Sequence, residues 1–169
     1  MVKNTLPEVD PLLDHISCQL QARFKPAQLQ TCVMIGIRTG GAWIAGRLHA
    51  SLPIQTQLGI LDISFYRDDF SQSGLNPTVK PSNLSCSIDN RQVILVDDVI
   101  MSGRTVRAAM NEIFDYGRPQ SITLVSLIDL SSRALPIQPD IVGHSMALKP
   151  SERIKLTGPE PLNLSLQNK

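Results

Sequence analysis

The sequence has no apolar run long enough to cross a bilayer, since its longest apolar stretches have the length of a single β-strand. The N-terminal stretch carries Glu8, Asp10 and Asp14 and lacks the apolar core of a secretory signal. From these two absences we expect a protein that makes no membrane contact and stays in the cytoplasm.

Clustered cysteine and histidine are also lacking, which excludes disulfide frameworks and zinc sites. Cys18, Cys32 and Cys86 are far apart, with no C-x-x-C pair and no histidines at ligand spacing. We expect reduced, mostly buried thiols. The formal net charge of +1 likewise gives no whole-surface basic excess of the kind that nucleic-acid-binding proteins usually show, although it leaves room for a local patch.

What the chain does have is the composition of a globular domain. Its 169 residues are 42% hydrophobic and 18% charged, and we expect residues 1–169 to form a single domain. Apolar residues at helical spacing predict helices over Glu8–Arg23, residues 42–52 and Thr105–Tyr116. The buried side of the third should carry Val106, Met110, Ile113 and Phe114.

Apolar and alternating stretches between these helices predict the strands of a sheet. They are Thr31–Ile37, Gln57–Tyr66, Val93–Val96 and Ser121–Leu130, with short final strands at Ile141–Val142 and Arg153–Leu156. Strands that alternate with helices predict an α/β fold with a central, mostly parallel sheet flanked by helices, which binds ligands at the carboxyl ends of its strands. Residues 67–91 are too long for an ordinary connection and are either a lid or a disordered segment. We expect the tail, residues 158–169, to be loosely held.

The stretch VILVDDVIMSGRT changes from a buried strand to two acids and then to a small-residue turn that opens a helix. We expect the strand to end on Asp97 and Asp98. The turn Ser102–Thr105 should aim free N–H groups and the positive end of the helix dipole at one point, which favours an anion. Gly103 lets the backbone approach that anion closely. The spacing differs from the G-x-x-x-x-G-K-[ST] loop of nucleotide triphosphatases.

Two adjacent carboxylates before a phosphate cradle are good acceptors for a pair of neighbouring hydroxyls. A ribose 5-phosphate fits both, with its phosphate on Ser102–Thr105 and its 2- and 3-hydroxyls on Asp97 and Asp98. Mg²⁺ could bridge the sugar oxygens to a further anionic group. The plainer alternative is that Ser102 merely caps the helix while the two acids lie in a solvated loop.

These residues resemble a known signature. VILVDDVIMSGRT is similar to the phosphoribosyl pyrophosphate (PRPP) binding motif of type I phosphoribosyltransferases. More narrowly, IGIRTGGAWIAGRL, LDISFYRDDF and DDVIMSGRTVRAAM resemble the PyrR family, pyrimidine operon regulators that double as uracil phosphoribosyltransferases. The resemblance covers most of the chain after the first helix. It implies the type I phosphoribosyltransferase fold with a flexible lid loop and a small hood region, and a homodimer or homotetramer.

The activity that the resemblance implies is the reaction of uracil with PRPP to give UMP and pyrophosphate, with Mg²⁺ assisting the leaving group. It also implies a regulator of pyrimidine biosynthesis genes that responds to UMP or PRPP. The residues implied to be catalytic are Asp97, Asp98 and Arg67, and the two acids are also the implied metal ligands, partly through the substrate. The implied substrate-binding residues are Tyr66, Arg38, Thr39, Gly40, Gly41, Met101, Ser102, Gly103, Arg104 and Thr105.

Within this set, the resemblance implies which part of the substrates each segment binds. Met101–Thr105 should hold the 5-phosphate, and the glycine turn Arg38–Gly41 should hold pyrophosphate. Tyr66 and Arg67 open the lid, where Arg67 should meet pyrophosphate. Uracil should be read largely by backbone groups around residues 130–136. Without the resemblance, the glycine turn is equally compatible with simple chain reversal.

Three positions depart from the patterns of related proteins. R-T-G-G stands where PyrR proteins commonly have K-T-R-G, so one positive charge moves or disappears at the pyrophosphate turn. Met101 stands where purine phosphoribosyltransferases carry an Asp near the base; an apolar Met cannot act as a general base, which favours a pyrimidine. L-S-S-R-A-L stands where RNA-binding members have R-G-H-R-E-L, and the lost cations should weaken binding of mRNA. The candidate cations for mRNA are Arg23, Lys25, Arg133 and Lys149.

Two hypotheses therefore remain open. The first is an enzyme that makes UMP, and the second is a regulator that keeps the PRPP pocket as a nucleotide sensor and does little chemistry. The altered R-T-G-G turn favours the sensor, whereas the retained Y-R-D-D motif at the start of the lid favours the enzyme.

Overall fold

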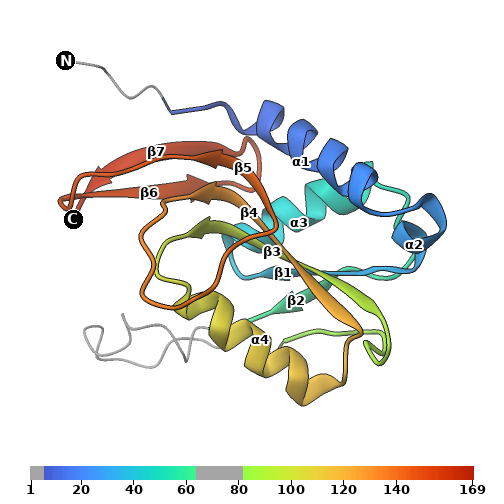
Figure 1. The fold of residues 1–169 in the computed structure, drawn as a ribbon. Helices are drawn as coiled ribbons and strands as arrows, with labels where there is room; N and C mark the ends of the chain where they lie inside the picture. Colours follow the sequence, from blue (N-terminus) through green and yellow to red (C-terminus); the bar gives the residue numbers. More distant parts are fainter. Residues whose placement is uncertain (1–5, 64–81) are drawn as a thin grey trace.

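The computed structural model describes residues 6–63 and 82–169 (Figure 1). A parallel five-stranded sheet with the order β2-β1-β3-β4-β5 forms its centre, and an antiparallel pair, β6 and β7, forms a second sheet. The strands are β1 (Val33–Ile37), β2 (Gly59–Leu61), β3 (Gln92–Ile100), β4 (Ser121–Asp129), β5 (Ile141–Ser145), β6 (Glu152–Thr157) and β7 (Asn163–Asn168). The predicted α/β fold with a parallel central sheet is confirmed.

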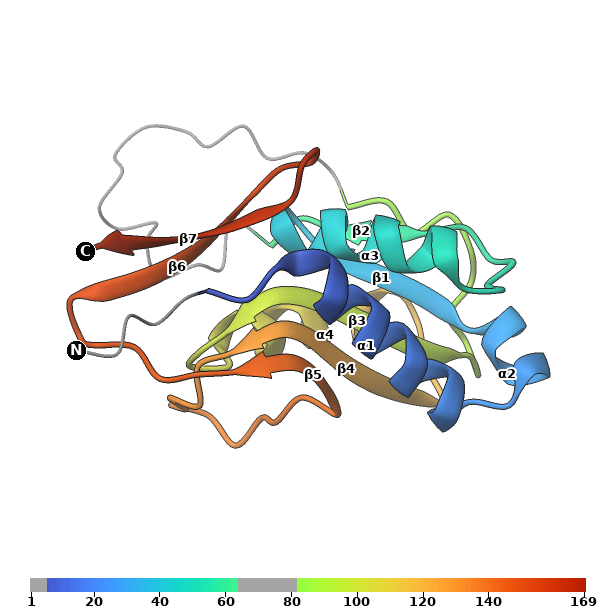
Figure 2. The same cartoon turned by 90° about the horizontal axis from the view of Figure 1, so that it is seen from above.

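Helices cover both faces of this sheet, as Figures 1 and 2 show. They are α1 (Val9–Arg23), α2 (Pro26–Thr31), α3 (Gly40–Ser51) and α4 (Arg104–Tyr116). Alternate residues of a strand point to opposite faces. In β3, Ile94 and Val96 therefore join the core beneath α1 and α3, whereas Val93 and Leu95 join the core beneath α4. The fully apolar run of β3 is explained by this burial on both sides.

The prediction that the third core strand ends on Asp97 and Asp98 is wrong, because β3 continues to Ile100. On one side β3 pairs with β1 only from Val93 to Val96, while on the other side its pairing with β4 extends to Ile100, opposite Asp129. The two acids thus lie inside a strand, at the place where its neighbour on one side has ended.

The prediction of a loosely held C-terminal tail is also wrong, because residues 163–168 form β7. This strand pairs with β6 from Thr157–Asn163 to Glu152–Asn168, and we call the pair the hood hairpin. Leu162 is buried, and Leu164 packs against the core that α1 and α3 cover. The alternation in N-L-S-L-Q-N is the local signal for this strand.

Smaller predictions also need correction. Phe114 is 48% exposed, because it lies at the edge of the α4 face that buries Val106 and Ile113. Cys18 is exposed, whereas Cys32 is buried and its burial raises the thiol pKa to about 11. β2 is shorter than predicted. Within residues 6–63 and 82–169, no helix combines the length and hydrophobicity that crossing a membrane requires.

Candidate active site

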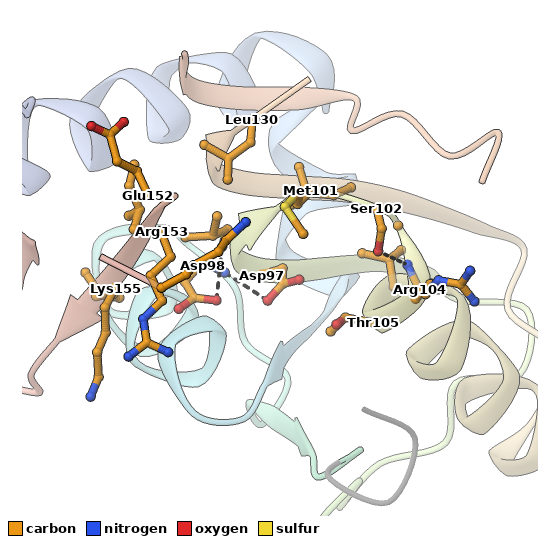
Figure 3. Close-up of a pocket in the computed structure, with 17 residues that line it drawn as sticks. Asp97, Asp98, Met101, Ser102, Arg104, Thr105, Leu130, Glu152, Arg153 and Lys155 are labelled. Atoms are coloured by element: carbon orange, nitrogen blue, oxygen red, sulfur yellow. Dashed lines mark hydrogen bonds between the residues drawn. The ribbon is translucent and has the colours of Figure 1, made fainter. Parts of the chain in front are cut away.

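A cavity of about 370 Å³ lies at the carboxyl end of β3, between the turn into α4 and the hood hairpin (Figure 3). Every residue that the sequence assigns to this corner lines it, namely Asp97, Asp98, Met101, Ser102, Gly103, Arg104 and Thr105. Leu130, which follows β4, and residues of β6 form the other walls. The fold thus brings the predicted acids and the predicted turn to one concave site at the edge where parallel sheets bind ligands.

The turn into α4 has a backbone conformation that favours glycine. Gly103, the N-cap of α4, has a φ of 87°, which lies in the left-handed region. Ser102 Oγ accepts a hydrogen bond from the Arg104 N–H at 3.3 Å. Ser102 therefore does support the first turn of the helix, as the capping alternative proposes, and it lines the cavity as well. The positive end of the α4 dipole lies at the cavity wall, where it favours an anion.

The two acids are held by backbone hydrogen bonds. Asp97 is only 2% exposed, and its Oδ1 accepts the N–H of Asp98 at 3.0 Å. Oδ1 of Asp98 accepts the N–H of Val99 at the same distance, 3.0 Å. Figure 3 shows both carboxylates between the turn at Ser102 and the hood hairpin. They are thus placed to meet a ligand whose phosphate lies on the turn.

The residues of the cavity fit a Mg²⁺ ion that binds together with the substrate better than one that the protein holds alone. In the part of the chain that the structure describes, no group of three or more His, Cys, Asp or Glu side chains is placed to hold a metal ion. Asp97 and Asp98 offer carboxylate oxygens, which Mg²⁺ prefers, but its octahedral shell needs further oxygens. A bound sugar phosphate would have to supply them.

The glycine turn after β1 does not line the cavity but packs against its acids. A Cβ atom on Gly40 would lie 2.1 Å from Oδ2 of Asp98, and one on Gly41 would lie 2.5 Å from the carbonyl oxygen of Val96. Only glycine allows the start of α3 to approach β3 this closely. The structure therefore brings this turn beside the acid pair.

Arg38 and Thr39 lie at the start of the same turn. Nε of Arg38 lies 3.6 Å from Oδ2 of Asp62 and is buried, with no hydrogen-bond partner among the described residues. Thr39 is the N-cap of α3, and its side chain makes no capping hydrogen bond. Arg38 is thus directed toward Asp62 and does not line the cavity.

Tyr66 and Arg67, with the rest of the Y-R-D-D motif, lie outside the described residues. The described residues on either side are joined, because Ile60 and Asn83 exchange backbone hydrogen bonds of 2.9 and 2.8 Å. In addition, the N–H of Asp62 donates to Oγ of Ser82 at 3.0 Å. The two ends of the described chain on either side of residues 64–81 therefore meet beside Asp62, which pairs with Arg38.

Sequence reasoning missed the cations that the hood hairpin brings to the cavity. Arg153, Lys155 and Lys169 line it. Figure 3 shows Arg153 and Lys155 across the cavity from the turn into α4. Arg153 and Lys155 are two residues apart in β6, so they share one face of the strand. The N–H of Lys169 donates to the carbonyl oxygen of Ser151 at 2.8 Å, which brings the end of the chain to the same place. The alternating E-R-I-K-L was the signal, but its position depends on pairing with β7.

Three of the four candidate cations for mRNA form ion pairs within the protein. Lys149, which is exposed, pairs with Glu152 at 3.8 Å. The side chain of Arg133 is 12% exposed and pairs with Asp129 at 2.8 Å. Arg23 pairs with Asp140 at 3.1 Å, near the surface. The expectation that Arg133 contacts mRNA is therefore not supported by its position.

Comparisons with known proteins agree with this geometry. Residues 9–150 match the phosphoribosyl transferase domain family. The chain is 52% identical over 164 residues to the "Bifunctional protein PyrR" of Pseudomonas savastanoi pv. phaseolicola, covering 97% of this chain and 96% of that one. It is 52% identical over 160 residues to the protein of the same name from Pseudomonas aeruginosa, with 95% and 94% coverage.

Solved structures of lower identity share the fold. A hypoxanthine phosphoribosyltransferase from Staphylococcus aureus superimposes with a TM-score of 0.65 at 22% identity, covering 90% of this chain and 81% of that one. A hypoxanthine-guanine phosphoribosyltransferase from Bacillus anthracis has a TM-score of 0.65 at 20% identity, with 91% and 87% coverage. These likenesses concern the fold alone. The domain match and the close relatives show that this chain is a phosphoribosyltransferase-fold protein that belongs to the PyrR family.

Proposed function

We propose that this protein is a uracil phosphoribosyltransferase that also responds to UMP or PRPP as a regulator of pyrimidine biosynthesis genes. The observation that carries the proposal is the single cavity shared by Asp97, Asp98 and the turn Ser102–Thr105. Family membership supports it, because the close relatives are named bifunctional PyrR proteins. We propose further that residues 1–169 act as one domain, in the cytoplasm, as a homodimer or homotetramer.

The residues of the cavity have distinct parts in the proposed reaction. The N–H groups of Ser102–Thr105, with the α4 dipole, hold the 5-phosphate. Asp97 and Asp98 accept hydrogen bonds from the ribose hydroxyls, and their negative charge stabilises the positive charge that develops on the sugar. Bound together with PRPP, Mg²⁺ would supply Lewis-acid assistance to the leaving pyrophosphate. The cations of the hood hairpin add positive potential on the opposite wall.

The apolar side chain in the cavity near the turn supports uracil as the base. Met101 is 46% exposed and lines the cavity with an apolar side chain that cannot accept a proton. Chemistry that needs a general base at this point is therefore disfavoured, which supports uracil over a purine. Leu130, also in the cavity wall, begins the loop that we expect to read the base through its backbone.

The second candidate function is a sensor with little catalytic activity. The position of Arg38 favours it, because this cation is directed at Asp62 and lies outside the cavity. A weak hold on pyrophosphate would slow turnover without weakening binding of UMP, which carries no pyrophosphate. Binding of mRNA by this protein should be weak, because Arg133 is engaged inside the fold.

One paired experiment tests these proposals. UMP formation from uracil, PRPP and Mg²⁺ is measured beside UMP binding by isothermal titration calorimetry. We expect both turnover and binding. Tight UMP binding without turnover would leave only the sensor, and the absence of both would contradict the assignment of the cavity.

A further inference from the structure

Arg133 lies in the loop after β4 and uses its guanidinium group to join three segments of the chain. Its Nε–H donates to the carbonyl oxygen of Ile137 at 2.7 Å, and Nη1 donates to the carbonyl oxygen of Met101 at 2.8 Å. Nη2 donates to Oδ1 of Asp129 at 2.8 Å. A planar, rigid group thus links the end of β4, the far arm of its own loop and the turn that opens α4.

The same loop also holds the next carbonyl group of the turn. The N–H groups of Ala134 and Leu135 both donate to the carbonyl oxygen of Ser102 at 3.1 Å. The loop therefore binds two successive carbonyl oxygens, those of Met101 and Ser102. Residues 131–138 do not line the cavity, so the loop holds these two carbonyl oxygens from outside it.

These carbonyl contacts decide where the N–H groups of the turn point. In a planar trans peptide unit the C=O and the following N–H point in opposite directions. A Met101 carbonyl that is held by Arg133 therefore turns the Ser102 N–H away from the loop. By the same reasoning, Ala134 and Leu135 turn the Gly103 N–H away from the loop.

The charge of Arg133 is compensated within the fold, so its effect on a ligand comes through geometry. Its side chain is 12% exposed and that of Asp129 is 9% exposed, and the two form an ion pair. Oδ1 of Asp129 also accepts the N–H of Ser131 at 2.7 Å, which fixes the acid in place. A guanidinium that is neutralised by Asp129 and does not line the cavity is a poor anion ligand, but it can hold in place the backbone that binds the anion.

We propose that Arg133 is a positioning residue for the phosphate site, because it holds the Met101 carbonyl and thereby aims the Ser102 N–H at the bound phosphate. The inference rests on the proposed function, since it requires a phosphate on this turn. It also connects the two halves of the site. The loop proposed to read the base and the turn proposed to bind the phosphate move as one unit through this side chain.

The test uses the full chain with Arg133→Ala and Arg133→Lys, and Arg107→Ala as the matched control. Arg107 is exposed on α4 and does not line the cavity, so its removal takes away one positive charge near the turn without touching Met101. UMP affinity is measured by calorimetry, and the Ser102 and Gly103 amide signals are followed by NMR during UMP titration. Thermal melts identify a temperature at which every variant is folded.

We expect both Arg133 variants to lose about 10- to 100-fold in UMP affinity, because the loss of one hydrogen bond to a charged group has an effect of this size. Lysine should not restore binding, since one ammonium cannot hold three acceptors in a plane. Added guanidinium ion should restore much of the affinity of Arg133→Ala, and ammonium ion at the same concentration should not. The shift of the Ser102 amide signal on UMP binding should be lost in the variants and kept in Arg107→Ala.

The outcomes separate this inference from the proposed function. If the unaltered protein binds UMP and a folded Arg133→Ala binds it equally well, the positioning role is contradicted while the proposed function stands. Rescue by ammonium as well as by guanidinium would show that charge alone matters and would also contradict it. If the unaltered protein does not bind UMP, the proposed function fails, and this inference fails with it.

Discussion

The molecule contains two strand-to-helix connections of the same kind, which we call corners, and they differ in how they contribute to the cavity. In each, a parallel strand leads through a short turn into a helix at the carboxyl edge of the sheet. One runs from β1 to α3, which begins with Gly40 and Gly41, and the other runs from β3 through Gly103 to α4. At the second corner, Met101–Thr105 line the cavity. At the first, Gly40 and Gly41 face the backbone and the acid of β3 at distances that leave no room for a side chain.

The difference shows that a glycine turn can serve a ligand site in two ways. Gly103 is needed for its left-handed backbone, which shapes the turn. Gly40 is needed because Asp98 occupies the space that a Cβ would take. In the proposed function the second corner offers N–H groups to an anion, whereas the first packs against the acid beside it. The sequence alone shows both as glycines between a strand and a helix.

We expect the largest effect from a substitution that disturbs the packing of the first corner against Asp98. In Gly40→Ala the new Cβ would lie 2.1 Å from Oδ2 of Asp98, so the carboxylate must move. We expect UMP affinity to fall about 100-fold, because a displaced Asp98 carboxylate loses its charge-assisted hydrogen bonds to the ribose. Gly46→Ala is the matched control, because it lies in the same helix with nothing within 4 Å of its Cβ position. Calorimetry with UMP measures both, and equal affinities would contradict the positioning role of this corner.

A second change keeps the shape of the site and removes charge. Asp97→Asn and Asp98→Asn should each weaken PRPP binding in the presence of Mg²⁺ by about 10- to 100-fold, since charge-assisted hydrogen bonds contribute about 1.5–3 kcal/mol. The difference between PRPP affinity with and without Mg²⁺ should also shrink. Unchanged affinity in both variants, measured by calorimetry, would contradict the placement of the sugar on these acids.

A third change tests the backbone of the second corner. Gly103→Ala places a Cβ on a residue with φ of 87°, and the nearest atom, Cβ of Ile137, would be 3.4 Å away. The contact is ordinary, so the cost should come from the left-handed conformation, at about 1–2 kcal/mol of unfolding free energy. Urea denaturation measures it. Gly103→Asn should cost less, because Asn adopts this conformation more readily; an equal loss in both would point to crowding instead.

The smallest effect concerns Cys32, which precedes β1 and the first corner. Burial disfavours the thiolate and raises the pKa of the Cys32 thiol to about 11, above its ordinary value of 9.0. The folded protein therefore holds this proton more tightly than the unfolded chain, so the stability contributed is present below pH 9 and is lost as the pH rises toward 11. Urea denaturation across this range should show a smaller alkaline loss of stability in Cys32→Ala. In labelling at pH 8, exposed Cys18 should react first.

Several features could be predicted from the sequence because local residues decide them. β1, β3 and β4 follow from apolar runs that are buried on both faces, and the turn into α4 follows from Ser102 and Gly103. The acids could be assigned to the site because they are adjacent to that turn. Each of these features depends on residues that are close together in the chain.

Other features depend on contacts between distant segments, which no local pattern shows. β3 extends to Ile100 because β4 lies beside it, and Lys155 reaches the cavity because β7 pairs with β6. Arg133 looked like a surface cation, but it turns inward because Asp129 and the Met101 carbonyl lie within reach. A charged residue in a loop can either contact a ligand or stabilise the fold. The groups that it contacts in the structure show which of the two it does.

The most direct test of the account is a crystal structure of the full chain with UMP. We predict that the phosphate lies on the N–H groups of Ser102–Thr105, with the ribose hydroxyls on Asp97 and Asp98. A structure in which this corner holds no nucleotide and UMP lies elsewhere would contradict the account.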